Sequence, residues 1–200
     1  MAARPLVRPI PWRDPLAAFA PHAGTPGAAL LSGGDFAILA PFPVALVEGG
    51  FDDLAAALAA RSAALPPGFG PFAGGAIGYF GYELGGTLER LPPPAATGPS
   101  LPDLRFALFD AAAVFDLRAR TAAVVSVGGA DSAERLAAAV ADAPELPPEP
   151  AWGETAWTPA WSRAEYEERI RRTLGYIRAG DIFQANVAQR FTAPRPAARP

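Results

Sequence analysis

The chain has 200 residues, of which 50% are hydrophobic, and its formal net charge is −3. This composition is typical of a globular protein with one good core or two small ones, and it lacks the positive field that attracts nucleic acid or an anionic membrane. Every basic residue is arginine and there is no cysteine. These absences exclude a lysine Schiff base, a P-loop lysine, a thiolate nucleophile, a disulfide and a cysteine-based metal site.

The N-terminal residues contain no apolar run of the kind found in secretory signals, and proline and glycine interrupt every apolar stretch before it could span a bilayer. The lack of cysteine is compatible with a reducing compartment. We therefore expect a soluble, cytoplasmic protein that has neither nucleic acid nor a membrane as a partner. The single histidine, His22, has no identifiable orienting partner, so a loop residue is strongly favoured over a general base.

Residues 27–40 predict a β-hairpin, with a tight turn at residues 32–35 and a second strand that ends at Pro41. Residues 51–64 predict a helix, because they are rich in alanine and leucine and carry acids in the first turn.

The segment FAGGAIGYFGYELGG, residues 72–86, allows two interpretations. A phosphate cradle would need GxxxxGK[ST], or GxGxxG opening a helix, and neither pattern is present. A strand and turn in which glycine permits close backbone approach is therefore favoured.

The runs LRFALFDAAAVFDL and TAAVVSV, joined by a turn at residues 118–120, predict one long hairpin. A short alanine-rich helix is expected over residues 131–141. Residues 142–160 are proline-rich and predict a connector between two structural regions.

The best-specified element follows, because Ser162 and Glu165 form a capping-box pattern and Gly180 stands where a left-handed cap belongs. Apolar residues at helical spacing predict its buried face: Tyr166, Ile170, Leu174 and Ile177. Four arginines flank this face, and a solvated surface is favoured over an anion site: Arg169, Arg171, Arg172 and Arg178.

Residues 182–191, IFQANVAQRF, alternate as a strand does. One face is mostly apolar and carries Phe183, Ala185, Val187, Gln189 and Phe191. The other carries Ile182, Gln184, Asn186, Ala188 and Arg190. Buried amides need hydrogen-bond partners, so this strand predicts the edge of a functional layer. In the isolated chain its apolar face should be exposed and favour aggregation.

Three segments together resemble the chorismate-utilising enzymes: ALLSGG, GGAIGYFGYELGGTLERLP and YIRAGDIFQANVAQRF. The resemblance implies an α+β fold, in which antiparallel sheets form a two-lobed α/β sandwich of the anthranilate synthase component I type, here incomplete. The absence of repeated βαβ units agrees with this class. Residues 1–141 would be the N-terminal region, 142–160 the connector, and 161–200 the truncated start of the chorismate-binding region.

Within the family, tryptophan-inhibited anthranilate synthases usually carry Leu-Leu-Glu-Ser in the first hairpin, whereas this chain has Leu31 where the acid would be. The resemblance is therefore greater to the aminodeoxychorismate synthases. Ser32 is the position that carries over as a ligand-binding residue of the tryptophan-pocket hairpin.

The resemblance implies that the parent protein converts chorismate and ammonia to 4-amino-4-deoxychorismate, for p-aminobenzoate and folate synthesis, with a glutamine amidotransferase subunit as its partner. Anthranilate synthesis is the alternative, and the isolated chain could also be a non-catalytic scaffolding lobe. The Mg²⁺ ligands, the acid/base groups and a lysine of this family lie after the QANVAQRF motif, so no catalytic or metal-binding residue is expected here. Gln184, Asn186 and Arg190 are expected to organise the active-site layer without touching substrate, with a solvated outer face as an equal alternative.

Overall fold

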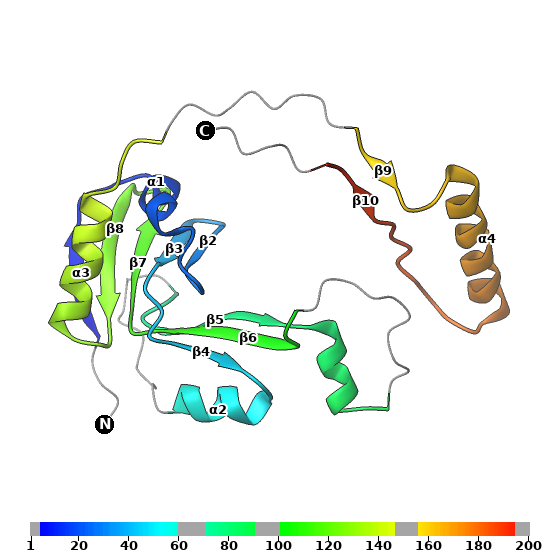
Figure 1. Ribbon diagram of the computed structural model, residues 1–200, viewed down its shortest axis with the longest axis horizontal. Helices are drawn as coiled ribbons and strands as arrows, with labels where there is room; N and C mark the ends of the chain where they lie inside the picture. Colours follow the sequence, from blue (N-terminus) through cyan, green and yellow to red (C-terminus); the bar gives the residue numbers. More distant parts are fainter. Residues whose placement is uncertain (1–4, 60–70, 91–100, 147–155, 195–200) are drawn as a thin grey trace. The chain divides into compact units, whose positions relative to one another are not determined.

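The computed structural model describes residues 5–59, 71–90, 101–146 and 156–194, and it divides the chain into two compact units, Met1–Pro147 and Pro148–Pro200 (Figure 1). The division falls inside the segment where we expected a connector. Residues 60–64 of the predicted helix and residues 147–155 of the connector lie outside the described part of the chain.

The first unit contains a five-stranded antiparallel sheet in the order β1-β8-β7-β3-β2. Its strands are β1 (Leu6–Ile10), β2 (Ala29–Gly33), β3 (Phe36–Ala40), β7 (Ala111–Asp116) and β8 (Thr121–Ser126). The helices beside it are α1 (Pro15–Phe19), η1 (Ala20–His22) and α3 (Ala130–Ala141), the last within one residue of its predicted start. α1 and α3 pack on one face of this sheet (Figure 1).

The core under α3 is built from alternate residues of neighbouring strands. Phe115 and Leu39 are almost fully buried, and Leu136 and Val140 of α3 cover them. Trp12 meets Phe115 edge-on, with ring centroids 5.8 Å apart, and the Arg120 guanidinium lies 5.1 Å from the Trp12 ring. These apolar contacts hold the helix layer on the sheet.

The predicted first hairpin is confirmed as β2 and β3, which pair from Ala29 with Ala40 to Gly33 with Phe36. The turn is shorter than we expected, because only Gly34 and Asp35 lie between the paired ends. Gly34 has a φ of 59°, a left-handed conformation that glycine adopts without a Cβ penalty.

A second, three-stranded sheet has the order β4-β6-β5, with strands β4 (Ala45–Glu48), β5 (Gly75–Phe80) and β6 (Leu104–Phe109). Helix α2 (Phe51–Ala59) and the 3₁₀ helix η2 (Tyr82–Thr87) lie beside it (Figure 1). Leu54, Leu84 and Leu104 form the buried contact between these helices and the sheet. The glycine-rich segment is therefore a strand followed by a helical turn, which confirms the favoured interpretation.

The prediction of one long strand over LRFALFDAAAVFDL is wrong, because the chain changes sheets at Asp110. Residues before it form β6 of the small sheet, and residues after it form β7 of the large sheet. The Asp110 carbonyl oxygen accepts hydrogen bonds from the backbone N–H groups of Val127 at 2.7 Å and Gly128 at 3.1 Å. These hydrogen bonds satisfy the Asp110 carbonyl group at the point where the strand is interrupted. The predicted hairpin is formed by β7 and β8 alone.

The second unit contains α4 (Arg163–Ala179), β9 (Thr158–Pro159) and β10 (Phe191–Thr192). The capping box of Ser162 with Glu165 is present, and Gly180 caps the other end with a φ of 83°, as predicted. No residue of α4 is buried, however, and Leu174 is 42% exposed. The predicted buried face thus lacks a complete cover among the described residues. No described helix of the chain is both long and apolar enough to cross a bilayer.

Among the described residues, the strand predicted over residues 182–191 forms only at its end, and its pairing with sequence outside this chain stays a prediction. Only Phe191 and Thr192 form a ladder, and their partners are Pro159 and Thr158, which precede α4 in the same unit. Residues 184–190 have no regular secondary structure. A strand needs a neighbour for its hydrogen bonds, and no other described segment pairs with these residues, so alternation alone did not produce one.

Gly78 in β5 is a position where a side chain has no room. A Cβ atom built there would lie 2.1 Å from the Arg105 carbonyl oxygen and 2.6 Å from the Phe106 Cα. We expect Gly78→Ala to destabilise the protein by about 1–3 kcal/mol, because backbone of the neighbouring strand must shift. Chemical denaturation of the purified protein measures this. Gly86→Ala is the control, since a Cβ there meets nothing within 4 Å, and an equal loss in both variants would contradict the assignment.

The Glu165 carboxylate stabilises the start of α4. Hydrogen bonds from the Ser162 backbone N–H, and then from the Ser162 hydroxyl, lower the pKa of Glu165 below its usual value. Because the pKa is lower in the folded state, this stabilisation is present above the unfolded-state value, about 4.3, and is lost as pH falls through the folded-state value. We expect an NMR titration of Ser162→Ala to move the Glu165 pKa upward. An unchanged pKa in that variant would show that the Ser162 hydroxyl does not perturb the carboxyl group, since the backbone N–H remains.

Candidate functional site

Ser32, the hairpin residue that the sequence analysis selected, lies in the edge strand of the large sheet. Ser32 is in β2, the edge strand, and it pairs with Ala37 of β3. Its side chain is exposed, and its hydroxyl makes no hydrogen bond to the described residues. Leu31 pairs with Ile38 and is 47% exposed. The edge therefore presents one free hydroxyl beside an exposed aliphatic side chain.

The acid in the turn of this hairpin pairs with an arginine. Asp35 stands in the turn, and its carboxylate lies 3.1 Å from the Nε of Arg118, with both side chains exposed. The Asp35 carbonyl also accepts a hydrogen bond from the Leu117 N–H at 2.8 Å. Such a surface pair is weak, and Leu31 itself offers no charge to the ammonium group of a ligand.

The glycine and aromatic segment has a packing role. The absence of a Cβ at Gly78 lets the Phe106 ring lie directly over the strand. Phe80 packs on Phe106 with ring centroids 4.9 Å apart, and Phe51 of α2 packs on Phe80 at 5.6 Å. Glycine followed by aromatics therefore builds a ladder of three rings on the α2 side of the small sheet.

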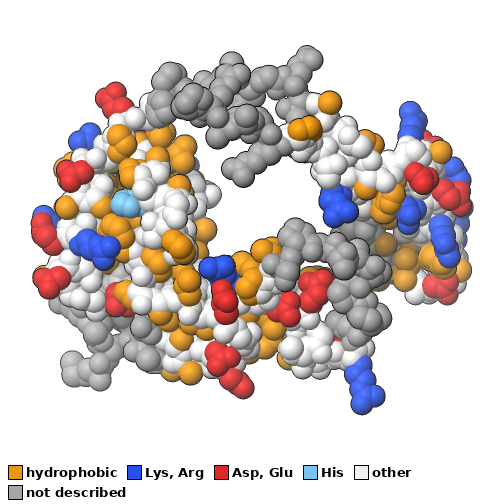
Figure 2. All heavy atoms as spheres, in the orientation of Figure 1, with side chains coloured by type: hydrophobic (Ala, Val, Ile, Leu, Met, Phe, Trp, Pro, Cys, Tyr) orange, Lys and Arg blue, Asp and Glu red, His pale blue; other side chains and the backbone are white. Residues whose placement is uncertain are grey.

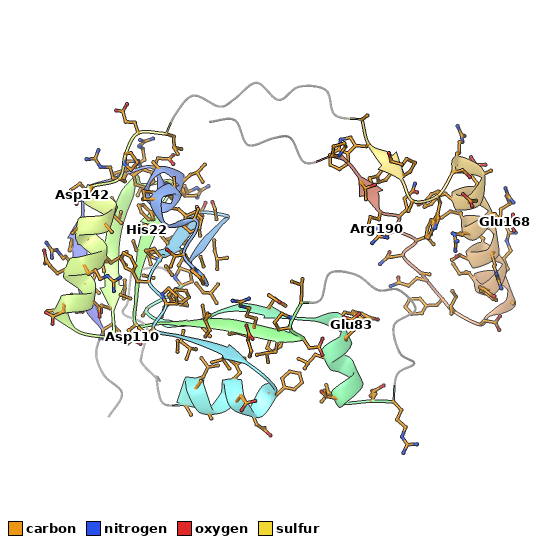
Figure 3. The ribbon with its side chains drawn as sticks, viewed as in Figure 1. His22, Glu83, Asp110, Asp142, Glu168 and Arg190 are labelled. Carbon is orange, nitrogen blue, oxygen red and sulfur yellow. The ribbon has the colours of Figure 1, made fainter. Side chains whose placement is uncertain are left out.

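The second unit places the other predicted site residues on a segment that runs beside the start of α4. Gln184, Asn186 and Arg190 all have exposed side chains, and Arg190 is labelled in Figure 3. The Arg190 carbonyl accepts a hydrogen bond from the Ala160 N–H at 2.8 Å. Among the described residues, no partner is seen for these three side chains. The structure neither assembles them into a polar network nor buries them.

The segment is held by residues that the sequence did not single out as functional. The Gln189 side-chain oxygen accepts a hydrogen bond from the Trp161 N–H at 3.3 Å. The Tyr166 hydroxyl donates to the Val187 carbonyl at 3.1 Å. In the sequence, Gln189 is the one amide on an otherwise apolar face. That amide was the only sign that this position makes a hydrogen bond.

The arginines of α4 interact within their own unit. Arg169 lies 3.9 Å above the Trp161 ring, Arg171 pairs with Glu168, and the Arg172 Nε donates to the Tyr176 hydroxyl at 3.2 Å. The shallow hollow on this helix carries both signs of charge, since it is lined by Ala164, Glu165, Glu168, Arg169 and Arg172. This arrangement supports the solvated surface and gives no focused anion site.

The histidine of the described residues packs against an aromatic ring, and the described acids form no metal-binding group. His22, labelled in Figure 3, ends η1. Its ring packs edge-on against Phe42, with ring centroids 5.0 Å apart. Within the described ranges, no cluster of three histidine or acidic side chains could hold a metal ion. The residues present therefore do not fit a Mg²⁺ site, and the expectation that its ligands lie outside this chain stays a prediction.

Comparison with known proteins gives the family. A family profile described as chorismate binding enzyme matches residues 48–200. Aminodeoxychorismate synthase component 1 of Salmonella typhimurium is 33% identical over 94% of this chain and 47% of its own length. Its counterpart from Klebsiella aerogenes is 40% identical over 62% of this chain and 27% of its length. Anthranilate synthase component 1 of Thermus thermophilus is 39% identical over 64% of this chain and 29% of its length.

The fold agrees with a solved relative. The crystal structure of anthranilate synthase component I from Streptococcus pneumoniae superimposes with a TM-score of 0.64, at 22% sequence identity, over 90% of this chain and 47% of that chain. This confirms the predicted α+β class with antiparallel sheets. The chain spans about half or less of the length of these relatives, and on the match over residues 48–200 it belongs to the chorismate binding enzyme family.

Proposed function

We propose that the protein to which this chain contributes converts chorismate and ammonia to 4-amino-4-deoxychorismate, with the C4 hydroxyl group leaving as water. The observation that carries the proposal is the β2–β3 hairpin, where Leu31 takes the place of an acid and Asp35 is engaged by Arg118. The similarity to the Salmonella protein over 94% of the chain supports the same activity.

The hairpin argues against feedback control by tryptophan. A carboxylate at the position of Leu31 could form a charge-assisted hydrogen bond to an amino acid's ammonium group, and such bonds are roughly twice as strong as neutral ones. The exposed Ser32 hydroxyl could still hydrogen-bond a ligand, but it carries no charge to complement an ammonium group.

Mg²⁺ would neutralise the substrate carboxylate and polarise the leaving group in such an enzyme. We assign no residue of the described ranges to the ion, because none forms a suitable cluster. Catalytic groups are likewise expected elsewhere in the parent protein, and the isolated chain is proposed to be a non-catalytic lobe.

The relatives from Salmonella and Klebsiella are each named as component 1 of their enzyme. By analogy we propose that the parent protein works with a second component, a glutamine amidotransferase that supplies ammonia. A cytoplasmic location fits this role and stays a prediction.

Anthranilate synthesis is the second candidate, and the 39% identity to the Thermus enzyme favours it. The two activities differ in whether pyruvate leaves the ring. We expect the full-length protein, given chorismate and ammonia, to form 4-amino-4-deoxychorismate without releasing pyruvate. Chromatography and a coupled pyruvate assay measure both outcomes, and stoichiometric anthranilate with pyruvate would assign the protein to the second activity.

Tryptophan should leave the turnover of the full-length protein unchanged, since Leu31 stands where the acid of the tryptophan-inhibited enzymes would be. Steady-state rates with and without added tryptophan, together with calorimetric titration, test this expectation. Leu31→Glu is the informative variant, because it restores the acid beside Ser32. Strong inhibition of the unmodified protein by tryptophan would show that another group binds the ammonium group of tryptophan.

Asn186→Ala in the full-length protein separates the two interpretations of the 182–191 segment. If Asn186 helps to order the active-site layer, kcat/KM should fall tenfold or more at unchanged melting temperature, each tenfold being about 1.4 kcal/mol. Gln189→Ala is the contrast, because loss of its bond to Trp161 should lower the melting temperature instead. If Asn186→Ala has the same kcat/KM as the unmodified protein, Asn186 is a solvated surface residue.

A further inference from the structure

One side chain of α4 holds the chain that follows this helix. We call residues 182–190 the return segment. The Tyr166 hydroxyl, near the start of α4, donates a hydrogen bond to the Val187 carbonyl at 3.1 Å. Within the part of the chain that the structure describes, residues 182–188 make no other hydrogen bond. The position of these residues along α4 therefore depends on the Tyr166 hydroxyl.

The return segment has to be extended to reach Tyr166. Gly180 caps α4, and the Asp181 N–H donates to the Tyr176 carbonyl at 3.0 Å, so the segment starts from the far end of the helix. An α-helix rises about 21 Å between the positions of Tyr166 and Gly180. The chain from Gly180 to Val187 spans at most about 25 Å. The segment runs back beside α4 toward β10 with little slack, so the bond at Val187 fixes its register (Figure 1).

The side of α4 that meets the return segment differs from its charged side. The half-buried residues of the helix are Tyr166, Ile170, Thr173 and Ile177. Their spacing places them in one stripe along α4. Glu168, labelled in Figure 3, lies off this stripe and pairs with Arg171, and Figure 2 shows acidic and basic side chains mixed over the helix. Tyr166 thus belongs to the stripe that contacts the return segment.

The return segment also has two sides. Its half-buried residues are Val187 and Gln189, and the Gln189 side chain accepts the hydrogen bond from the Trp161 N–H just before α4. Alternate residues of an extended chain point to opposite sides, so Asn186 belongs to the side that is turned away from α4. A slip of one residue would exchange the two sides. The bond from Tyr166 therefore selects the side chains that the segment directs away from the helix.

We propose that Tyr166 is a positioning residue for the reaction. Its hydroxyl fixes the register of the return segment, and through the segment it directs Gln184 and Asn186 toward the active-site layer. The inference rests on the proposed function for the chemistry of that layer, and on the bond to Val187 for the placement. A backbone carbonyl oxygen has two lone pairs, so the bond is compatible with a strand ladder between the return segment and further sequence.

Hydrogen exchange with mass spectrometry on the full-length protein tests the placement. Tyr166→Phe removes the hydroxyl and keeps the ring, so the amides of residues 182–188 should exchange at least fivefold faster, because the segment opens locally. Tyr176→Phe is the matched control, since it removes a hydroxyl whose partner is the Arg172 Nε of the same helix. This control should leave the exchange of the segment unchanged. Unchanged exchange in Tyr166→Phe would overturn the inference.

Steady-state kinetics with chorismate and ammonia test the positioning role. Tyr166→Phe should lower kcat at least fivefold and leave KM within twofold, because Asn186 is proposed to order the layer without touching substrate. The double variant of Tyr166→Phe with Asn186→Ala should lose no more activity than the weaker single variant, since both changes disturb one segment. Tyr176→Phe should leave both constants unchanged. Additive losses in the double variant, or an unchanged kcat in Tyr166→Phe, would overturn the positioning role.

The two measurements separate this inference from the proposed function. If the unmodified full-length protein forms no product from chorismate and ammonia, the proposed function fails. The exchange of residues 182–188 then still decides whether Tyr166 holds the return segment. If the protein turns over chorismate, and Tyr166→Phe exchanges faster without a change in kcat, the proposed function stands and the positioning role fails.

Discussion

The first unit depends on the tight crossing at Asp110, where the chain leaves the small sheet at Phe109 and enters the large sheet at Ala111; it passes the other way between Ala40 and Ala45. The buried Ser126 side chain closes this junction, because its hydroxyl donates to the Gly129 carbonyl at 3.0 Å and accepts from the Gly128 N–H at 3.2 Å. Asp110 supplies the carbonyl that satisfies two further backbone donors. A strand cannot be interrupted in a protein interior unless its backbone groups find such partners.

The crossing at Asp110 joins the two sheets through the chain itself. β6 carries Phe106 into the ring ladder, and β7 pairs with β3, which in turn holds the hairpin strand that bears Ser32. The hairpin and the ring ladder therefore lie in two separate hydrogen-bonded sheets that one residue of chain connects at this point.

The sequence predicted the elements whose signals are local. The capping box of α4, the left-handed Gly180 and the β2–β3 hairpin all depend on residues within a few positions of one another, and all are confirmed. The failures concern partners that are distant in sequence. Alternation could not reveal that one apolar run serves two sheets, nor that residues 184–190 pair with none of the segments that the structure describes. The ring ladder was missed for the same reason, since Gly78 and Phe106 meet only after the strands pair.

The position of the tryptophans offers a means of following each unit separately. Trp12 is the one tryptophan among the first 147 residues and is packed between Phe115 and Arg120, whereas Trp161 lies beneath Arg169 in the second unit. Indole emission is sensitive to burial and to a neighbouring cation. Replacing the remaining tryptophans would therefore yield two optical reporters, one that reads the melting of the sheet core and one that reads the fraying of α4. Such spectra would show whether the two units lose their structure in one cooperative step or in succession.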